Sequence, residues 1–191
     1  MHALLRNGQG AIACYNIEIT GCSASSASTV ICQHHWTYCA PSPCGRLPAG
    51  LCESATGEQP SLIAAILADA AHLEGAAVFA FQWVERELMV HGAPALLVER
   101  ARSAQRDEKR HHAAISGLAA RFGAQVAAVE VDPVGVRPLV EVAVENAIEG
   151  CVRETWGAAV AAFQGERAGD RAVRRAMRSI AIEEAEHASL G

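Results

Sequence analysis

The chain has 191 residues, of which 51% are hydrophobic, which is enough for one domain with a sizeable core or for one domain with an appendage. Its formal net charge of -5 gives no reason to expect nucleic acid or an acidic membrane surface as a partner. No run of about 18 apolar residues is present, so we expect no transmembrane helix.

Residues 1–60 form a Cys-rich segment that is nearly uncharged and rich in Ser, Gly and Pro. Within it, residues 13–22 alternate as a short strand does, and residues 28–39 are a suitable partner, which predicts a short β-hairpin. Six of the seven cysteines lie here: Cys14, Cys22, Cys32, Cys39, Cys44 and Cys52. Such a cluster is typical of disulfides formed in an oxidising compartment.

The location of the protein stays open at this stage. Residues 1–12 lack the apolar stretch of a signal peptide, so the chain as written is expected in the cytoplasm, where disulfides are rare. A periplasmic or envelope location follows instead if a signal peptide upstream is missing. We therefore leave open whether the six cysteines form disulfides.

Zinc is a second reading of the same segment, with Cys32, His34, His35, Cys39 and Cys44 as ligands. Structural zinc sites usually have closely spaced cysteine pairs, and the segment has no CxxC pair, so we favour disulfides. A rubredoxin-like iron centre would need two CxxC pairs and is not supported. The electron donor for any redox chemistry is therefore unknown.

Residues 61–191 are predicted to form four helices. The expected helices run from about 62 to 91, from 94 to 122, from 138 to 164, and from 171 to the end, with turns at 91–94 and 165–170 that contain Gly or Pro. Residues 124–138, between the second and third helices, are Val-rich, contain two prolines and are expected to be extended.

That connection sets the topology of the predicted bundle. A helix of 30 residues is about 45 Å long, and fifteen extended residues span about 50 Å. The connection can therefore cross the full length of the bundle. We expect an all-α fold, an antiparallel four-helix bundle of the ferritin-like class in which a long crossover joins two helix hairpins.

Two similar motifs place charged residues in the middle of helices. The segment RDEKRHH carries Glu108 and His111, and IEEAEHA carries Glu184 and His187. Residues at i and i+3 lie on one face of a helix, so each pair can direct a carboxylate and an imidazole at one point. Together with one Glu from each partner helix, this is the ligand set of a two-metal carboxylate bundle.

The partner carboxylates follow from the turns, because residues equidistant from the turn of a helix hairpin lie at equal height. The midpoint of Glu74 and Glu108 falls at the first turn, and the midpoint of Glu149 and Glu184 falls inside the second. We therefore predict Glu74 and Glu149 as ligands. Glu154 also has its midpoint with Glu184 in the turn and is the alternative, and Glu145 shares the stripe of Glu149.

Two further carboxylates, Asp107 and Glu183, precede the predicted ligands. Each can accept the N–H of a ligating histidine on another helix, which would fix its tautomer, or can lie in solvent. Oxygen-rich ligation with one His per metal suits two Fe ions, or alternatively Mn or a mixed Fe/Mn pair. His112 is a fallback ligand if the true partner of Glu108 is four residues away.

The stretches 73–81, 106–113, 146–158 and 182–190 resemble the ferritin-like, rubrerythrin-like superfamily, and more closely a group of bacterial ferritin-like domain proteins. The resemblance covers about residues 62–190. It implies metal ligands at Glu74, Glu108, His111, Glu149, Glu184 and His187, and a di-metal centre that reacts with O2 or peroxide. The sequence ends four residues after His187, so we expect the last helical turn to be poorly held.

Three functions are compatible with these observations. The first is a di-iron oxidoreductase of unknown substrate, with no catalytic residue beyond the metal ligands. The second is a ferroxidase or iron-handling protein. The third is a metal-free envelope or partner-binding module in which the bundle is a scaffold. A homodimer is compatible with each of these three functions.

Overall fold

The computed structural model describes residues 14–26, 29–39, 46–52 and 57–190. The chain divides into two compact units, residues 1–42 and 43–191. In the first, β1 (Cys14–Ser26) pairs with β2 (Thr29–Cys39) in an antiparallel hairpin. The backbone register sets Cys14 opposite Cys39 and Cys22 opposite Cys32. The cysteine and histidine side chains on these strands lie outside the described part of the structure. The disulfides and the zinc site therefore stay predictions.

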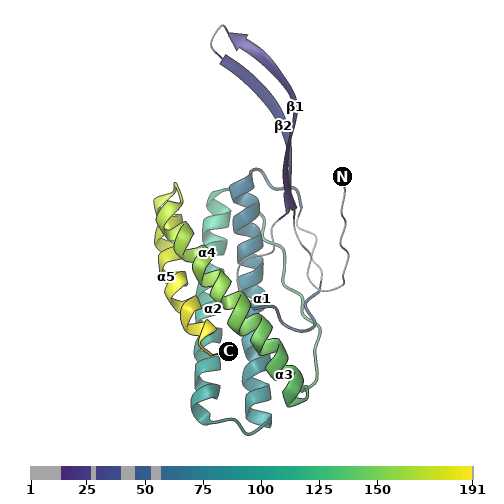
Figure 1. The fold of residues 1–191 in the computed structure, drawn as a ribbon, viewed down its shortest axis with the longest axis vertical. Coiled ribbons are helices and arrows are strands. Elements are labelled where there is room, and N and C mark those ends of the chain that lie inside the picture. The colour runs from purple at the N-terminus through teal and green to yellow at the C-terminus, as the bar shows by residue number, and fades with distance from the viewer. Residues whose placement is uncertain (1–13, 27–28, 40–45, 53–56, 191) are drawn as a thin grey trace. The chain divides into compact units, whose positions relative to one another are not determined.

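The second unit is a helical bundle whose elements are drawn in Figure 1. Its helices are α1 (Leu62–Val90), α2 (Ala95–Arg121), α3 (Leu139–Glu145), the π-helix η1 (Asn146–Arg153), α4 (Glu154–Arg167) and α5 (Arg171–Ala188). Because α3, η1 and α4 follow one another without a break, they make one long helix. Four long helices therefore pack together, and the all-α bundle is confirmed.

Local signals account for where the helices begin and end. The Ser61 hydroxyl caps α1 by accepting from the Ala64 N–H at 3.2 Å, and the Asp170 carboxylate caps α5 by accepting from the N–H groups of Ala172 and Val173. The turns after α1 and α2 contain Gly92 and Gly123, whose φ angles of 70° and 73° favour glycine.

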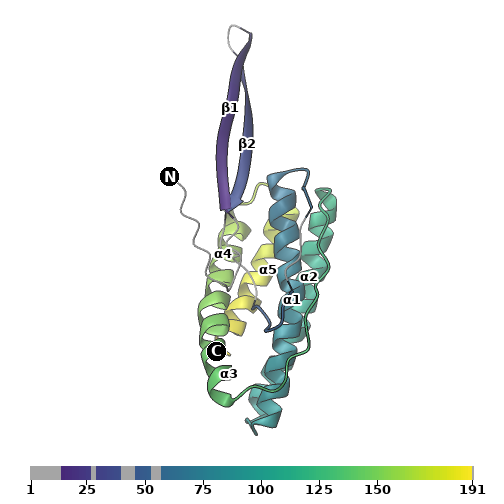
Figure 2. The same ribbon diagram turned by 90° about the vertical axis from the view of Figure 1, so that its right-hand side faces the viewer.

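The crossover, residues 122–138, travels along α1 from one end of the bundle to the other, as Figures 1 and 2 show. The segment 46–52 lies beside it: the N–H of Cys52 donates to the Glu130 carbonyl at 2.9 Å, and that of Asp132 to the Gly50 carbonyl at 2.8 Å. Cys52 is a free thiol. This segment thus belongs with the bundle, and the units divide near residue 42 rather than at the predicted boundary of 60.

A hydrophobic cluster fills one end of the bundle. It is built by Leu67, Ala70 and Ala71 of α1; Ile115, Leu118 and Ala119 of α2; Ala161 of α4; and Val173, Met177 and Ile180 of α5. Helix α1 is long and apolar enough in composition to cross a membrane, but 61% of its most apolar window is buried inside the bundle. Burial of this extent is typical of the core helix of a bundle.

Candidate metal centre

Next to the core, six ionisable side chains from all four long helices point toward one another. None of these six side chains is more than 3% exposed. They are Glu74 from α1, Glu108 and His111 from α2, Glu154 from α4, and Glu184 and His187 from α5. Buried charges are costly unless they are paired or bind a metal, so this layer needs a compensating cation.

The six residues form two overlapping groups, each with ligand atoms within 4.8 Å of one another. One group contains Glu74, Glu108, His111 and Glu184, and the other contains Glu108, Glu154, Glu184 and His187. Glu108 and Glu184 belong to both groups, so each of these carboxylates could help to hold either of two ions. Each group then adds one further carboxylate and one imidazole of its own.

Apart from ion-pair contacts of 3.0–3.9 Å between the two Nδ1 atoms and the carboxylates, the ligand atoms in this layer have no hydrogen-bond partner. They are both carboxylate oxygens of Glu74, Glu108, Glu154 and Glu184, together with Nδ1 of His111 and Nδ1 of His187. Buried polar atoms are otherwise almost always hydrogen-bonded, because leaving one unsatisfied costs about 1–3 kcal/mol. Ten such atoms at one place are the donor set that a pair of metal ions would satisfy.

Both imidazoles have the orientation of a metal ligand. Nε2 of His111 lies 2.5 Å from Oε2 of Glu183, and Nε2 of His187 lies 3.3 Å from Oδ2 of Asp107. These contacts favour the tautomer in which Nε2 carries the proton. The lone pair on Nδ1 then faces the carboxylates, and Nδ1 of His111 is 3.1 Å from Oε1 of Glu184. Each histidine is thus oriented by a carboxylate from another helix, as in carboxylate–histidine–metal triads.

The electrostatics of the metal-free layer show how strongly it attracts positive charge. Burial, and then the charge of Glu108, raise the pKa of Glu74 well above its usual value, and burial also raises that of Glu154. The pKa of Glu184 rises to about 7, chiefly through burial and the charge of Glu108. Protons are therefore held here in place of other cations.

The remaining groups of the layer complete that picture. Burial alone would lower the pKa of His111 and raise that of Glu108, but the contacts between them outweigh it. As a result the pKa of His111 is raised and that of Glu108 falls to about 2. In the metal-free protein, Glu108 is thus the carboxylate that stays ionised between two protonated imidazoles.

One predicted ligand, Glu149, lies outside the centre. Its Oε2 accepts from the Leu47 N–H at 3.0 Å and pairs with Nε of Arg153 at 3.1 Å. Glu154, the alternative, is fully buried among the other ligands. The preference for Glu149 is therefore corrected to Glu154.

The reason lies in the second turn. Helix α4 continues to Arg167 and α5 begins at Arg171, so the turn is centred on residue 169 rather than in the middle of 165–170. Position 169 is also the midpoint of Glu154 and Glu184. In addition, η1 has the wider turns of a π-helix, so faces drawn at 3.6 residues per turn are misplaced across residues 146–153.

Glu145, a second alternate, serves a separate buried network. The Arg46 guanidinium is 1% exposed, donates to both carboxylate oxygens of Glu145 at 3.2 and 2.9 Å, and also donates to Oδ1 of Asn146 at 2.6 Å. Arg137 joins Glu145 to the buried Glu87. Sequence reasoning missed Arg46, although it is the only charged residue between Glu18 and Glu53.

The last helical turn, expected to be poorly held, makes several contacts in the structure. Helix α5 continues to Ala188, and the Leu190 N–H donates to the His187 carbonyl at 2.9 Å. Arg100 of α2 donates to the Ser189 hydroxyl at 2.7 Å. The His187 ring meets the buried Phe81 ring edge to face, with centroids 5.1 Å apart. His187 is thus fixed on several sides.

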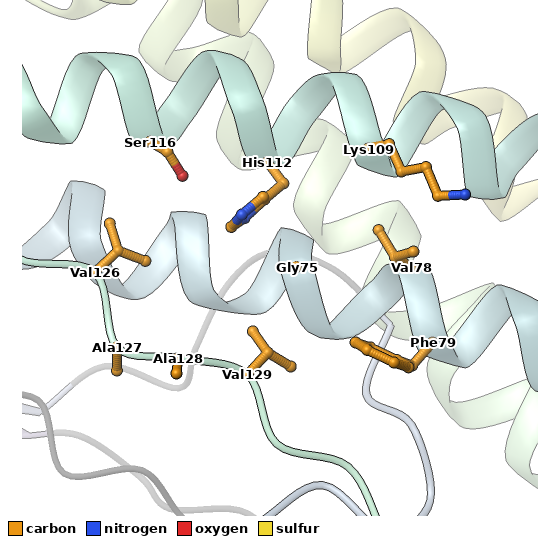
Figure 3. A pocket seen from close by; sticks show the side chains of 10 residues that line it. All are labelled: Gly75, Val78, Phe79, Lys109, His112, Ser116, Val126, Ala127, Ala128 and Val129. Atoms are coloured by element: carbon orange, nitrogen blue, oxygen red, sulfur yellow. The ribbon is translucent and has the colours of Figure 1, made fainter.

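His112, the fallback ligand, points away from the centre. Figure 3 shows it pointing from α2 toward α1, in a pocket of about 490 Å³ that is lined by α1, α2 and the crossover. Its Nδ1 contacts the Ala71 carbonyl at 2.7 Å. A Cβ at Gly75 would lie 2.9 Å from Val129 and 3.0 Å from His112, so glycine allows this close packing. The pocket and the Glu/His layer therefore occupy opposite faces of the α1–α2 pair.

Comparison with known proteins gives no relative. No family model, no curated protein and no solved structure matches this chain.

Proposed function

We propose that this chain is a two-metal carboxylate protein in which Glu108 and Glu184, the residues common to both ligand groups, would help to hold both ions. Glu74 and His111 would complete one coordination shell, and Glu154 and His187 the other. The observation that carries the proposal is the set of ten buried ligand atoms that make no hydrogen bond and lie in two overlapping groups. The orientation of both imidazoles supports it independently, because Nε2–H is already engaged and Nδ1 faces inward.

Iron is the metal we propose, with Mn or a mixed Fe/Mn pair as the alternative. Carboxylate oxygens with a single imidazole per ion suit these metals, whereas structural zinc sites favour Cys and His ligands. Four carboxylates also balance the charge of two divalent ions. Both cysteines described in the bundle unit, Cys52 and Cys151, lie outside the two ligand groups.

We further propose that the chain belongs with the ferritin-like proteins and acts as an oxidoreductase on O2 or peroxide. Two bound Fe ions would supply electrons to such an oxidant. The chain itself holds the ions through six side chains from four helices and keeps the Nε2 proton of each imidazole on a carboxylate. It also excludes bulk water, since every ligand is buried.

Two alternatives make different demands on the same residues. A ferroxidase or iron-handling protein would use this centre to oxidise Fe(II) as its substrate. A metal-free envelope or partner-binding module would need no centre at all. The second alternative leaves four buried carboxylates with only two imidazoles to compensate their charge, and this cost disfavours it.

Elemental analysis tests the proposal, with protein purified without added metal and again after anaerobic loading with Fe(II) and exposure to air. We expect about two Fe or Mn per chain and near-ultraviolet absorbance that rises on oxidation. Glu108→Ala and Glu184→Ala should each abolish that absorbance, while Glu149→Ala should retain it. Metal-free protein in both samples, or full absorbance in the Glu108 and Glu184 variants, would refute the centre.

A second measurement separates the oxidoreductase from the iron-handling alternative. Fe(II) is added in large excess under air, and the iron retained per chain is counted after gel filtration. Retention of about two Fe is the expected result. Tens of Fe per chain, in an assembly of many subunits, would favour iron handling.

A further inference from the structure

The outer face of the long α3–η1–α4 helix carries a row of large apolar side chains. We call Val140, Val144, Ile148, Val152, Trp156 and Phe163 the α3–α4 stripe; each is between 53% and 69% exposed. In Figure 1 this helix lies in front of the other helices of the bundle. Scattered exposed apolar residues are ordinary, but a contiguous row of this kind marks an interaction surface.

The π-helix keeps this row straight. In an α-helix, residues four apart drift by about 40° around the axis, so a strict i, i+4 series winds away from its starting face. The wider turns of η1, in the middle of the series, offset that drift. As a result the first five members of the stripe share one face, and Glu154, Gly157 and Ala161 lie buried on the opposite face.

The stripe contributes little to the bundle itself. The core is built by buried residues on the other face of α4 and on the remaining helices. The stripe exposes on the order of 600 Å² of apolar surface, if a fully exposed large side chain is taken to contribute about 200 Å². An interface core is about 65% apolar, so this area corresponds to roughly 900 Å² per partner, the size of a stable interface.

The pattern of the stripe is symmetric about Val152. Ile148 and Trp156 lie four residues on either side of it, and Val144 and Val160 lie eight residues away. A second copy in antiparallel orientation, related by a two-fold axis near Val152, would therefore set apolar residues against apolar residues from 144 to 160, whereas Val140 and Phe163 at the two ends of the stripe would meet Gln164 and Glu141. Interfaces of this isologous type are the commonest in homodimers.

Charge is compatible with the same pairing. Between residues 140 and 163, a two-fold axis at Val152 sets every charged residue opposite an uncharged one. Glu141 meets Phe163, Glu149 meets Thr155, and Arg153 meets Cys151. The antiparallel register thus brings no like charges together. Like charges in contact would disfavour association.

From the area, the symmetry and the charges, we infer that the α3–α4 stripe is the dimer interface of this protein, and that its partner is a second copy of the chain packed antiparallel across Val152. The inference does not depend on the metal centre, because Glu154, the one proposed ligand on this helix, lies on its opposite face. It predicts that a single charge at the two-fold axis breaks the dimer while metal content is unchanged.

The test compares the full-length protein with two charge variants by sedimentation equilibrium from about 1 to 100 µM. We expect a dimer for the wild type. Val152→Glu places two like charges at the axis and should raise the dissociation constant about 30-fold or more. The matched control is Ile182→Glu, a 66% exposed residue on α5 outside the stripe, which should stay dimeric.

A crosslinking experiment on the wild type supplies a test that needs no charged variant. Cys151 is exposed and adjacent to the proposed axis, so a short bis-maleimide should join Cys151 of two chains, as identified by peptide mass spectrometry. Cys151→Ser should lose that crosslinked peptide. A monomer at 100 µM, a dimer unaffected by Val152→Glu, or a monomer that floats with lipid vesicles would each overturn the inference.

Discussion

His111 of α2 and Glu183 of α5 contact each other across the bundle, with Nε2 and Oε2 2.5 Å apart. A second contact runs the other way, from His187 of α5 to Asp107 of α2, at 3.3 Å. Arg110 joins the two acceptors by pairing with both Asp107 and Glu183. Each histidine of the centre is therefore oriented by the residue that precedes the ligand glutamate of the other motif.

This cross-helix arrangement predicts a graded loss of metal affinity. Glu183→Gln removes the charge that orients His111, so we expect two metal ions still to bind, but about 10–100-fold more weakly. Asp107→Asn should have a smaller effect, because its contact with His187 is longer. Competition with a coloured chelator measures both affinities. Glu186→Gln, an exposed neighbour on the same helix, is the control; an equal loss there would count against a role for Glu183.

The two overlapping ligand groups predict how stoichiometry changes. Glu154 belongs to only one group, so Glu154→Gln should lower the metal content from about two ions to about one per chain. Glu149→Gln changes the same functional group five residues away, outside the centre, and should leave the content at two. Both are measured by elemental analysis after anaerobic loading. Loss of metal in the Glu149 variant, with full content in the Glu154 variant, would restore the original assignment.

The stability of the metal-free protein should fall as pH rises. The folded pKa of Glu184, about 7, lies above the ordinary value of 4.5, so the folded state binds this proton more tightly than the unfolded state does. The stabilisation is complete below pH 4.5 and is lost as pH rises through 7, on the order of 3 kcal/mol for this carboxyl. The raised pKa of His111 acts in the same direction.

Urea denaturation at pH 5, 6, 7 and 8 measures this slope. Metal binding requires deprotonated ligands, so the stabilisation by added metal should grow over the same range. Glu184→Gln should flatten the slope of the metal-free protein. A metal-free protein whose free energy of unfolding rises from pH 5 to 8 would show that these groups are not protonated as described.

The buried Arg46 predicts a stability effect at a distance from the centre. Arg46→Met leaves Glu145 with Arg137 as its remaining cation, at 3.2 Å, so we expect a loss of about 3 kcal/mol, the lower end of the range for breaking a buried pair. A double-mutant cycle with Glu145→Leu should give a coupling energy of about 1–3 kcal/mol. The free energies come from urea denaturation. Additive losses would mean that the pair contributes no coupling.

Helix boundaries were well predicted from sequence because they depend on local signals. The end of α1 was predicted within one residue and that of α2 within one, at turns containing Gly92 and Gly123. Five of the ligands were predicted correctly because they lie on regular α-helices, where residues three apart share a face. They are Glu74, Glu108, His111, Glu184 and His187.

What sequence reasoning missed depends on tertiary context. The π-helix has no local signature, so nothing in residues 146–153 marked the wider turns that separate Glu149 from the centre. Arg46 lies in a segment that was assigned to the Cys-rich part, yet its partners are about 100 residues away. Its isolation as a charge in an uncharged segment was the available signal.

The position of the core gives α1 two ends of different character. Residues 67–71 pack into the hydrophobic cluster, whereas beyond Glu74 the buried side chains of Ala77, Phe81 and Val84 lie past the ligand layer, together with the ion pair of Glu87 with Arg137. Without a cation in that layer, amide protons of the second half of α1 should exchange with solvent faster than those of the first half. Metal ions would then even out protection along the helix, so that occupancy of the centre is reported by backbone amides at residues 80–90.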